Sequence, residues 1–410
     1  MKKHTYRTKN VNQINWPELR NTLNGQPVIF AIDVAKEQQY ALLTTADDSV
    51  SQFIKWPLFE TTHLINELTQ LNCPISIVME ATGTYGDAMR YQFKTAGFTI
   101  YQVHAKQVND AKEIYDGVPS LHDAKSAYLI ARLHKQACTK PWCDLDDNAR
   151  ELNAARREYD IHQDQYDRNR NRLEAYLSRH WPEVLPIVDL SSVTLENLLI
   201  TYGSPQDIAA HAVEAAKKMK IWGRTFLSDD KISQIIISAQ NTIGVPCIDA
   251  ERQYLQALAR EMQHSRCEGK VAKQQIEAKV EAMDGLQEMA RLIGKLTTAA
   301  LISLHLDPRL FPSARCFLKA LGLNLKEKSS GQIQGRLKLS KRGSSTARKY
   351  LFLAALRLIQ NDSVIARWYQ KKLNPNAKMK MVAACMRKLA KALWHVARGA
   401  KFDAAKLVTL

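Results

Sequence analysis

The sequence has no apolar stretch long enough to cross a membrane and no cysteine pattern typical of secreted proteins. None of its apolar runs reaches the roughly 18 residues that a membrane-spanning helix needs. The basic N-terminus is followed by VNQINWPELR and not by an apolar segment, so we expect no secretory signal. The seven cysteines are scattered, odd in number and without a CxxC pair, which argues against both a disulfide framework and a zinc site. We therefore expect a reduced, cytoplasmic protein.

Acidic residues are also scarce relative to basic ones. The 410 residues include 58 Lys and Arg against 41 Asp and Glu, which gives a formal net charge of +17. An excess of this size indicates a polyanionic partner, usually nucleic acid, and says nothing about the fold. The length predicts two or three domains, and the 45% of apolar residues are sufficient for ordinary hydrophobic cores.

The first part of the chain has the pattern of an α/β domain. Between residues 28 and 140, short β-rich segments come first and then alternate with helical patterns. The expected strands are VIFAID, QYALLTT, SVSQFIKW, ISIVMEA and TIYQVHA. The expected helices lie near residues 60–71, 86–97 and 122–137.

The middle of the chain is dominated by two long predicted helices, over residues 145–180 and 249–283. In the first, two rows of residues recur every seven positions, which predicts a coiled-coil seam with several polar members. These rows are Leu152, Tyr159, Tyr166, Leu173 and His180, and Ala155, His162, Asn169 and Tyr176. Six arginines are expected beside the seam, either on an ordinary solvated face or in contact with nucleic acid: Arg156, Arg157, Arg168, Arg170, Arg172 and Arg179. Residues 182–247 form an insertion between the two arms.

The last part of the chain is helical except for one loop, LKEKSSGQIQGRLKLSKRGSS. Between Lys326 and Lys349 it contains eight basic residues, three glycines, five serines and one acid, Glu327. A long loop of this kind inside a helical domain is more often functional than not, although a flexible basic linker is the alternative.

Three acids occupy positions where they can act together. Asp33 ends the first expected strand, Glu80 ends another buried strand, and Asp123 opens a helix. A carboxylate at the end of a buried strand either caps a turn or has a cationic partner, because burial of an unpaired charge is costly. Asp123 has the alternative role of a helix N-cap. Together the three predict an acidic set that holds two divalent ions for attack on a phosphodiester.

Four motifs resemble those of a known family. AIDVAKE, MEATGTYG, PSLHDAKSAYLIARL and the C-terminal LGLN…SSG…G…LSKRG are similar to the DEDD-type insertion-sequence transposases of the one-ten/eleven-eleven family, which are related to the Piv DNA invertases. The resemblance covers residues 28–140 and 286–405. It implies an RNase H-like, RuvC-like N-terminal domain, a coiled-coil middle and a helical C-terminal domain.

The resemblance also implies roles for individual residues. It places four metal ligands at Asp33, Glu80, Asp123 and the position of Ser126, where the family has a fourth acid. A serine there departs from the pattern; Ser126 could act through water, or Asp116 could replace it. The nucleophile implied by the loop motif is Ser330, with Ser329 as second choice.

Further expectations follow for binding. The basic residues expected to contact phosphates are Lys326, Lys328, Arg336, Lys341 and Arg342 in the loop, and Arg168, Arg170 and Arg172 on the first arm. The family resemblance implies Mg²⁺ as cofactor, donor and target DNA and a structured non-coding guide RNA as partners, and a dimer of dimers whose subunits share composite sites. It also implies a bacterial, nucleoid-associated protein.

The sequence therefore predicts a DNA recombinase of a mobile element that works through a phosphoserine intermediate. The alternatives are an RNase H-like hydrolytic nuclease such as a junction resolvase, and a catalytically weakened nucleic-acid-binding relative, which Ser126 favours. The expected domains are an extension (1–27), the RuvC-like domain (28–140), the coiled-coil arms with their insertion (141–285) and the C-terminal transposase domain (286–410).

Overall fold

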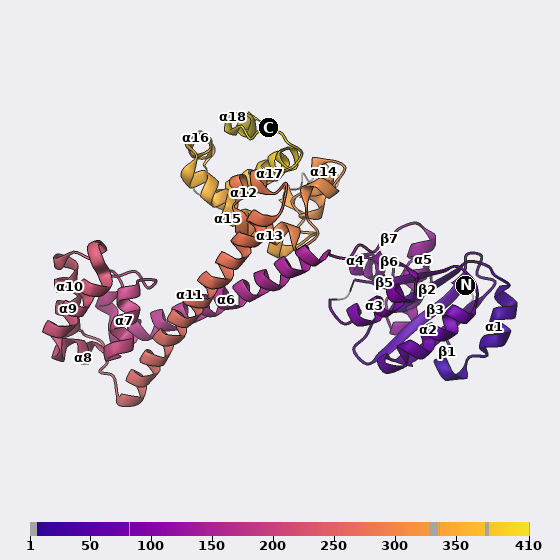
Figure 1. The fold of residues 1–410 in the computed structure, drawn as a ribbon, viewed down its shortest axis with the longest axis horizontal. Coiled ribbons are helices and arrows are strands. Elements are labelled where there is room, and N and C mark those ends of the chain that lie inside the picture. The colour runs from indigo at the N-terminus through magenta and orange to yellow at the C-terminus, as the bar shows by residue number, and fades with distance from the viewer. Residues whose placement is uncertain (1–5, 82, 328–334, 336, 374–376, 410) are drawn as a thin grey trace. The chain divides into compact units, whose positions relative to one another are not determined.

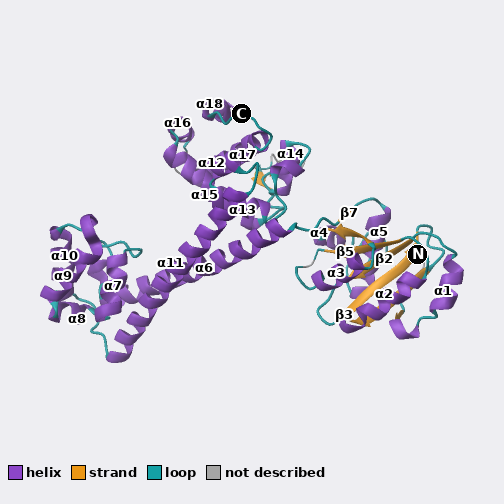
Figure 2. Cartoon of the chain, in the orientation of Figure 1, coloured by secondary structure: helices purple, strands orange, loops and turns teal. Residues whose placement is uncertain are grey.

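The computed structural model describes residues 6–409 apart from 82, 328–334, 336 and 374–376 (Figure 1). The chain divides into two compact units, Met1–Asp144 and Leu145–Leu410. The first contains the large sheet and the second is mainly helical (Figure 2). No described helix is long and apolar enough to span a membrane.

A mixed sheet organises the first unit. The strands that the structure describes there are β1 (Thr8–Asn10), β2 (Val28–Asp33), β3 (Gln38–Thr45), β4 (Ser51–Pro57), β5 (Ile75–Glu80), β6 (Thr99–Val103) and β7 (Lys140–Pro141). Their order in the sheet is β1-β4-β3-β2-β5-β6-β7. β2, β3 and β4 are antiparallel neighbours, whereas β5 and β6 continue parallel to β2. The centre of the sheet is thus the β2–β5 pair.

Helices cover both faces of this sheet. They are α1 (Trp16–Leu23), α2 (Thr61–Gln70), α3 (Asp87–Thr95), α4 (Ala105–Asp110) and α5 (Asp123–Lys135). Because successive strand residues point to opposite faces, Phe30 and Ile32 pack with residues of α2 and α3, while Ala31 packs beneath α5. Burial on both faces explains why β2 and β5 are almost uniformly apolar until their last residue.

Two helices of 34 residues form the backbone of the second unit: α6 (Asp147–His180) and α11 (Asp249–Ala282). They run antiparallel, since Lys279 bonds to Glu151 near one end and Tyr176 packs against Tyr254 near the other. Asp146 caps α6 by accepting from the Ala149 N–H at 2.7 Å. Figure 1 shows the two helices packed against each other and crossing at an angle.

Two hydrophobic cores lie at opposite ends of this helix pair. One is formed with the insertion, whose helices are α7 (Val193–Tyr202), α8 (Pro205–Ala210), α9 (Ala212–Gly223) and α10 (Asp229–Gln240). The other is formed with α12 (Gln287–Ile293), α13 (Lys295–Ile302), α14 (Ala314–Ala320), α15 (Ser345–Asn361), α16 (Ser363–Lys372), α17 (Lys378–Val396) and α18 (Ala404–Thr409). A short hairpin, β8 (Leu325–Lys326) and β9 (Lys338–Leu339), interrupts the helices.

The five strands and three helices expected in the α/β region are confirmed within a few residues, and both long helices are confirmed. The sequence missed β1, α1, α4 and β7. Two expectations were wrong. Arg156 is buried against Asp160 and Ser303 rather than on a solvated flank. The basic loop does not extend to Lys349, because Ser344 caps α15, which begins at Ser345.

The heptad rows of α6 do lie on its inner face, with Leu152, Leu173 and His180 fully buried. Whether the two helices supercoil as a coiled coil stays a prediction, as does the finer division of the chain into four domains.

Candidate active site

The candidate active site lies at one edge of the sheet, where two central strands end in acids. β2 and β5 pair in parallel up to Ile32 opposite Met79, so Asp33 and Glu80 follow at adjacent strand ends. Both side chains are half-buried. The sheet topology therefore brings together two acids that are 47 positions apart in the sequence.

Asp123 approaches the same edge from α5, which packs across β2 and β3. The N-cap of this helix is His122, whose ring accepts from the Lys125 N–H at 3.3 Å. Asp123 is the first helical residue and its side chain is exposed. The alternative that Asp123 serves as the N-cap is thus wrong, and its carboxylate is not used in that way.

The three acids, called the acidic edge below, are close enough to affect one another electrostatically. Burial, followed by the charges of Asp123 and Glu80, raises the pKa of Asp33 from 3.8 to about 7. Burial also raises the pKa of Glu80. Mutual repulsion and desolvation make this edge a place where a positive partner is stabilising.

Ser126 belongs to the same cluster. It lies one helical turn after Asp123, is 6% exposed, and its side chain forms a hydrogen bond with Asp33 that lowers the Asp33 pKa against the other effects. The position where the family has a fourth acid is therefore in contact with the acidic edge, and a hydroxyl occupies it.

Asp116 does not replace the missing acid. It accepts a hydrogen bond from the buried Lys125 ammonium at 2.9 Å and another from the Tyr6 hydroxyl at 3.3 Å. These donors hold the pKa of Asp116 below its usual value. Lys125 also donates to the Val118 carbonyl at 2.7 Å, so it ties the loop before α5 to the helix.

The acidic edge has the right donors for a hard divalent cation, because carboxylate oxygens are the ligands that such ions prefer. Among the described residues, no three His, Cys, Asp or Glu side chains form a group that could hold a metal ion as they stand. Burial, and after it the charges of Asp123 and Glu80, disfavour the ionised form of Asp33 and raise its pKa, and a cation would relieve both effects.

Sequence reasoning missed His104, which follows the third parallel strand. β6 pairs with β5 up to Val103 opposite Glu80, so His104 leaves the sheet at the same edge. Its ring caps α4 by accepting from the Lys106 N–H at 3.2 Å. His104 could have been placed at this edge from the sequence, because it lies in the expected strand TIYQVHA and the ends of parallel strands lie side by side.

The serine loop is described only at its base. Ser330, Ser329, Lys328 and Arg336 lie outside the described residues. The loop leaves from β8 and returns through β9, and below this hairpin Ser340 donates its N–H to the Asn324 carbonyl at 2.8 Å.

In the turn that follows, residues 341–343 lie very close to the backbone of residues 320–322. Lys341 has a positive φ of 54° and donates its N–H to the Gly322 carbonyl at 3.0 Å. A Cβ at Gly343 would collide with the Ala320 carbonyl oxygen, so only glycine fits there. The backbone of the LSKRG motif is therefore held in place against residues 320–322, and it forms the base of the loop.

The other predicted phosphate contacts are exposed basic residues of the second unit. Lys326 lies in β8, and Arg342 lies at the foot of the loop. On α6, Arg168 and Arg170 are exposed, whereas the exposed Arg172 donates to Asn169 at 3.1 Å. Their accessibility is compatible with contacts to nucleic acid and with an ordinary solvated face.

A mixed sheet with three acids at one edge is consistent with an RNase H-like domain of the DEDD type. Residues 30–182 match a family model described as "Transposase", whose name specifies the DEDD transposases of IS110, and residues 288–370 match the "Transposase IS116/IS110/IS902 family". The two matches together cover more than half of the chain, which belongs to the IS110 family of transposases. No curated protein matches the chain.

Membership of this family makes the chain a DNA-processing enzyme that binds DNA. DEDD domains use divalent metal ions, which fits the oxygen donors of the acidic edge.

Proposed function

We propose that this transposase cuts DNA strands and rejoins them to new partners through a phosphoserine intermediate. The observation that carries the proposal is the acidic edge, where burial, and then the charges of Asp123 and Glu80, raise the pKa of Asp33 to about 7. Such an arrangement is costly unless a cation neutralises it, and phosphoryl transfer is the chemistry that clustered carboxylates with divalent ions support.

Asp33, Glu80 and Asp123 are the proposed Mg²⁺ ligands, and Ser126 is proposed to hold the Asp33 carboxylate in position through its hydrogen bond. When bound, Mg²⁺ supplies charge stabilisation to the reacting phosphate and lowers the pKa of a coordinated hydroxyl. The role of Ser126 is that of a positioning residue, which differs from the ligand role of the acid that the family has there.

Ser330 is the proposed nucleophile. Its hydroxyl oxygen attacks phosphorus and loses its proton, and a bond forms between the serine oxygen and phosphorus. The bond from phosphorus to a deoxyribose oxygen breaks, and that oxygen takes up a proton and leaves as a hydroxyl. Attack by a hydroxyl of another strand reverses the process, releases the serine and restores a phosphodiester. No external energy source is needed, because the number of phosphodiester-type bonds is conserved throughout.

Two further parts of the proposal concern partners. A structured guide RNA selects donor and target DNA, and the formal charge of +17 supports an assembly that holds both nucleic acids. The long helices α6 and α11 are the proposed contacts in a dimer of dimers. Sequencing of nucleic acid that copurifies with the protein tests the RNA component directly.

The decisive experiment is to trap the covalent intermediate. Wild-type protein with its copurified RNA is incubated with Mg²⁺ and DNA carrying the element's ends, denatured, and examined for a protein–DNA adduct by phosphopeptide mapping. Phosphate on Ser330 supports the proposal. Cleavage without any adduct supports the hydrolytic nuclease, in which water attacks, and no Mg²⁺-dependent cleavage by the wild type supports the weakened binding relative.

A further inference from the structure

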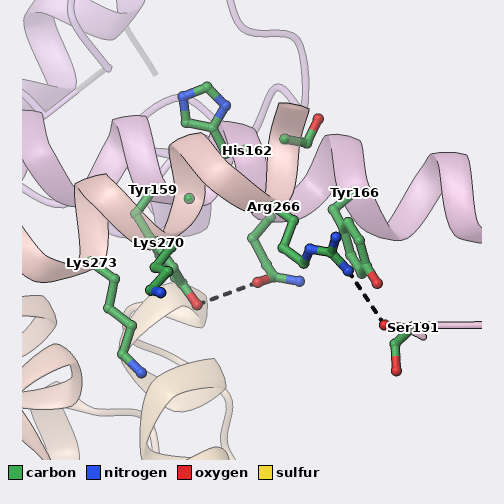
Figure 3. Close-up of a pocket in the computed structure, with 10 residues that line it drawn as sticks. Tyr159, His162, Tyr166, Ser191, Arg266, Lys270 and Lys273 are labelled. Atoms are coloured by element: carbon green, nitrogen blue, oxygen red, sulfur yellow. Dashed lines mark hydrogen bonds between the residues drawn. The ribbon is translucent and has the colours of Figure 1, made fainter. Parts of the chain in front are cut away.

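The seam between α6 and α11 changes character half-way along its length. Towards the C-terminal helices it is closed by apolar residues such as Leu152 and Ile276, and towards the insertion by Leu173 and Met262. Between these two cores the seam is polar and aromatic. A cavity of about 280 Å³, called the seam notch below, opens there (Figure 3).

Small residues on α11 create the seam notch. Gly269 faces His162 of α6, and a Cβ built at Gly269 would come no closer than 3.5 Å to the His162 Cβ, so there is space where a side chain is usual. A glycine inside a helix is less stable there than an alanine would be, and α11 has a glycine at this position all the same. Two tyrosines, Tyr159 and Tyr166, line the same space from α6.

Ser265 provides an independent sign that the seam notch is built to receive a polar group. It lines the notch and is 1% exposed, and its hydroxyl has no hydrogen-bond partner among the described residues. A buried hydroxyl without a partner lowers stability, so such groups normally form a hydrogen bond. A ligand in the notch would satisfy this one.

Basic side chains border the seam notch. Lys270 and Lys273 lie on the side of Tyr159, and Arg266 lies on the side of Tyr166 (Figure 3). Arg266 is held by Glu196 of the insertion at 2.9 Å, and Lys273 is 3.8 Å from Glu277. Lys270 is exposed and forms no ion pair with any residue that the structure describes.

Two of the acids on α6 near this border are already paired with a lysine, while a third, Asp167, lies close enough to Tyr159 to act on it electrostatically. Asp160 and Asp164 both face Lys349 of α15, at 3.4 and 3.7 Å. Burial, and then nearby acids, raise the pKa of the Tyr159 phenol, which keeps it a neutral ring. The notch thus combines neutral aromatic walls with a lysine that has no ion pair and a hydroxyl that has no hydrogen bond among the described residues.

We propose that the seam notch binds one unpaired nucleotide of a single-stranded nucleic acid. Its base would lie between Tyr159 and Tyr166 and bond to the Ser265 hydroxyl, while Lys270 and Lys273 neutralise the adjoining phosphates. Aromatic walls with basic borders are the common solution for single strands, because every base has a face that stacks. The volume lies just below the usual range for ligand pockets of about 300–1,000 Å³, which suits one base.

The proposal adds a binding site to the proposed function. It rests on that function in one respect only, that the chain binds nucleic acid. It adds an anchoring point far along the sequence from the acidic edge and the serine loop. A base-paired nucleotide could not enter the notch, because its faces and edge are occupied by its stacked and paired neighbours. The notch therefore distinguishes single strands from duplexes.

The test uses the full-length protein and fluorescence anisotropy with labelled dT and U oligonucleotides of equal length and with a duplex. Ser265→Ala removes only a hydroxyl without a partner, so thermal stability should hold while single-strand affinity falls by roughly threefold or more. Gly269→Leu fills the notch and should lower single-strand affinity by roughly tenfold or more, with little change for the duplex.

Charge is tested by Lys270→Gln/Lys273→Gln against the matched pair Lys217→Gln/Lys231→Gln, whose exposed lysines lie on α9 and α10. The first pair should weaken single-strand binding well beyond the second. A loss confined to U or to dT supports the proposal and identifies the nucleic acid as RNA or DNA.

Unchanged single-strand affinity in Ser265→Ala and in a folded Gly269→Leu protein would overturn the proposal, as would equal losses for single strand and duplex. Asp33→Asn separates this result from the proposed function. It should abolish strand cleavage and keep single-strand affinity, so failure of the metal site and failure of the notch give different outcomes.

Discussion

Replacing Asp33 by asparagine removes one charge from the acidic edge with almost no change in side-chain size. In the folded protein the pKa of Asp33 is raised from 3.8 to about 7, mainly by burial and then by Asp123 and Glu80. The folded state therefore holds a proton that the unfolded chain releases between these two pH values. Stability falls as pH rises through this window, and the full loss is present above pH 7.

The size of the effect follows from the pKa shift. At ~1.4 kcal/mol per pKa unit, Asp33 lowers the stability of the metal-free fold, relative to pH values below 3.8, by at most about 4 kcal/mol at pH 8 and by about 1–2 kcal/mol at pH 5. Asparagine carries no charge in either state. Asp33→Asn should thus be more stable than wild type in EDTA, and its advantage should grow by about 2–3 kcal/mol from pH 5 to pH 8.

The assay must be local, because the chain forms two units and global unfolding is not expected to be two-state. Hydrogen exchange of peptides that cover β2 and β5 reports the opening of the sheet itself. Glu37→Gln is the matched control, since it removes an exposed acid from the loop that follows β2 and should change little. Wild type and both variants are compared at the same pH.

Mg²⁺ provides the converse measurement. Binding to the folded state alone stabilises it by linkage, so Mg²⁺ should increase protection of β2 and β5 in wild type and much less in Asp33→Asn. If Asp33→Asn is less stable than wild type at pH 8, or if its advantage does not change with pH, the reasoning about the acidic edge is wrong.

Three further outcomes are expected. Ser126→Asp places a fourth carboxylate beside Asp33, so it should destabilise the metal-free sheet. The same carboxylate should tighten Mg²⁺ binding, which calorimetry measures. Weaker Mg²⁺ binding would mean that the site has adapted to serine. Nucleic-acid affinity should fall steeply with salt: on duplex DNA the logarithm of the affinity should fall with the logarithm of the salt concentration at a slope of ~0.9 per phosphate contact. Changing Arg168, Arg170 and Arg172 to glutamine should reduce that slope in anisotropy titrations without removing cleavage. A flat salt dependence would contradict this expectation. Ser330→Ala should bind DNA and Mg²⁺ without forming an adduct on denaturing gels, whereas Ser329→Ala keeps some activity; near-normal strand exchange by Ser330→Ala would rule out the phosphoserine route.

The central strands could be predicted because burial on both faces leaves a clear signal. β2 and β5 are continuous apolar runs that end in an acid, and both were expected with their bounds. The short elements could not be predicted in this way. β1 has three polar or basic residues, Thr8 to Asn10, and exists only because it pairs with β4, a contact that local sequence does not encode.

The acidic edge was predictable for a similar reason, since parallel strands end together. The contact between Ser126 and Asp33 was not, because it depends on where α5 crosses the sheet. For Arg156 the prediction from the sequence was wrong. Its heptad position indicated a solvated flank, but Asp160 and Ser303 satisfy its guanidinium in the interior. Tertiary partners of charged residues are invisible to periodicity alone.

The way in which the insertion joins α6 and α11 bears on how the insertion can be replaced. The chain leaves α6 and returns to α11 at neighbouring points, since the Val245 N–H donates to the Arg179 carbonyl at 2.9 Å. Gly244 permits this approach, because a Cβ there would collide with the His180 backbone. The four small helices are thus inserted at a closed stem, so that the chain enters and leaves the insertion at one place. A replacement that keeps this stem must also cover the apolar residues of α6 and α11 that the insertion now buries, such as Leu173 and Met262.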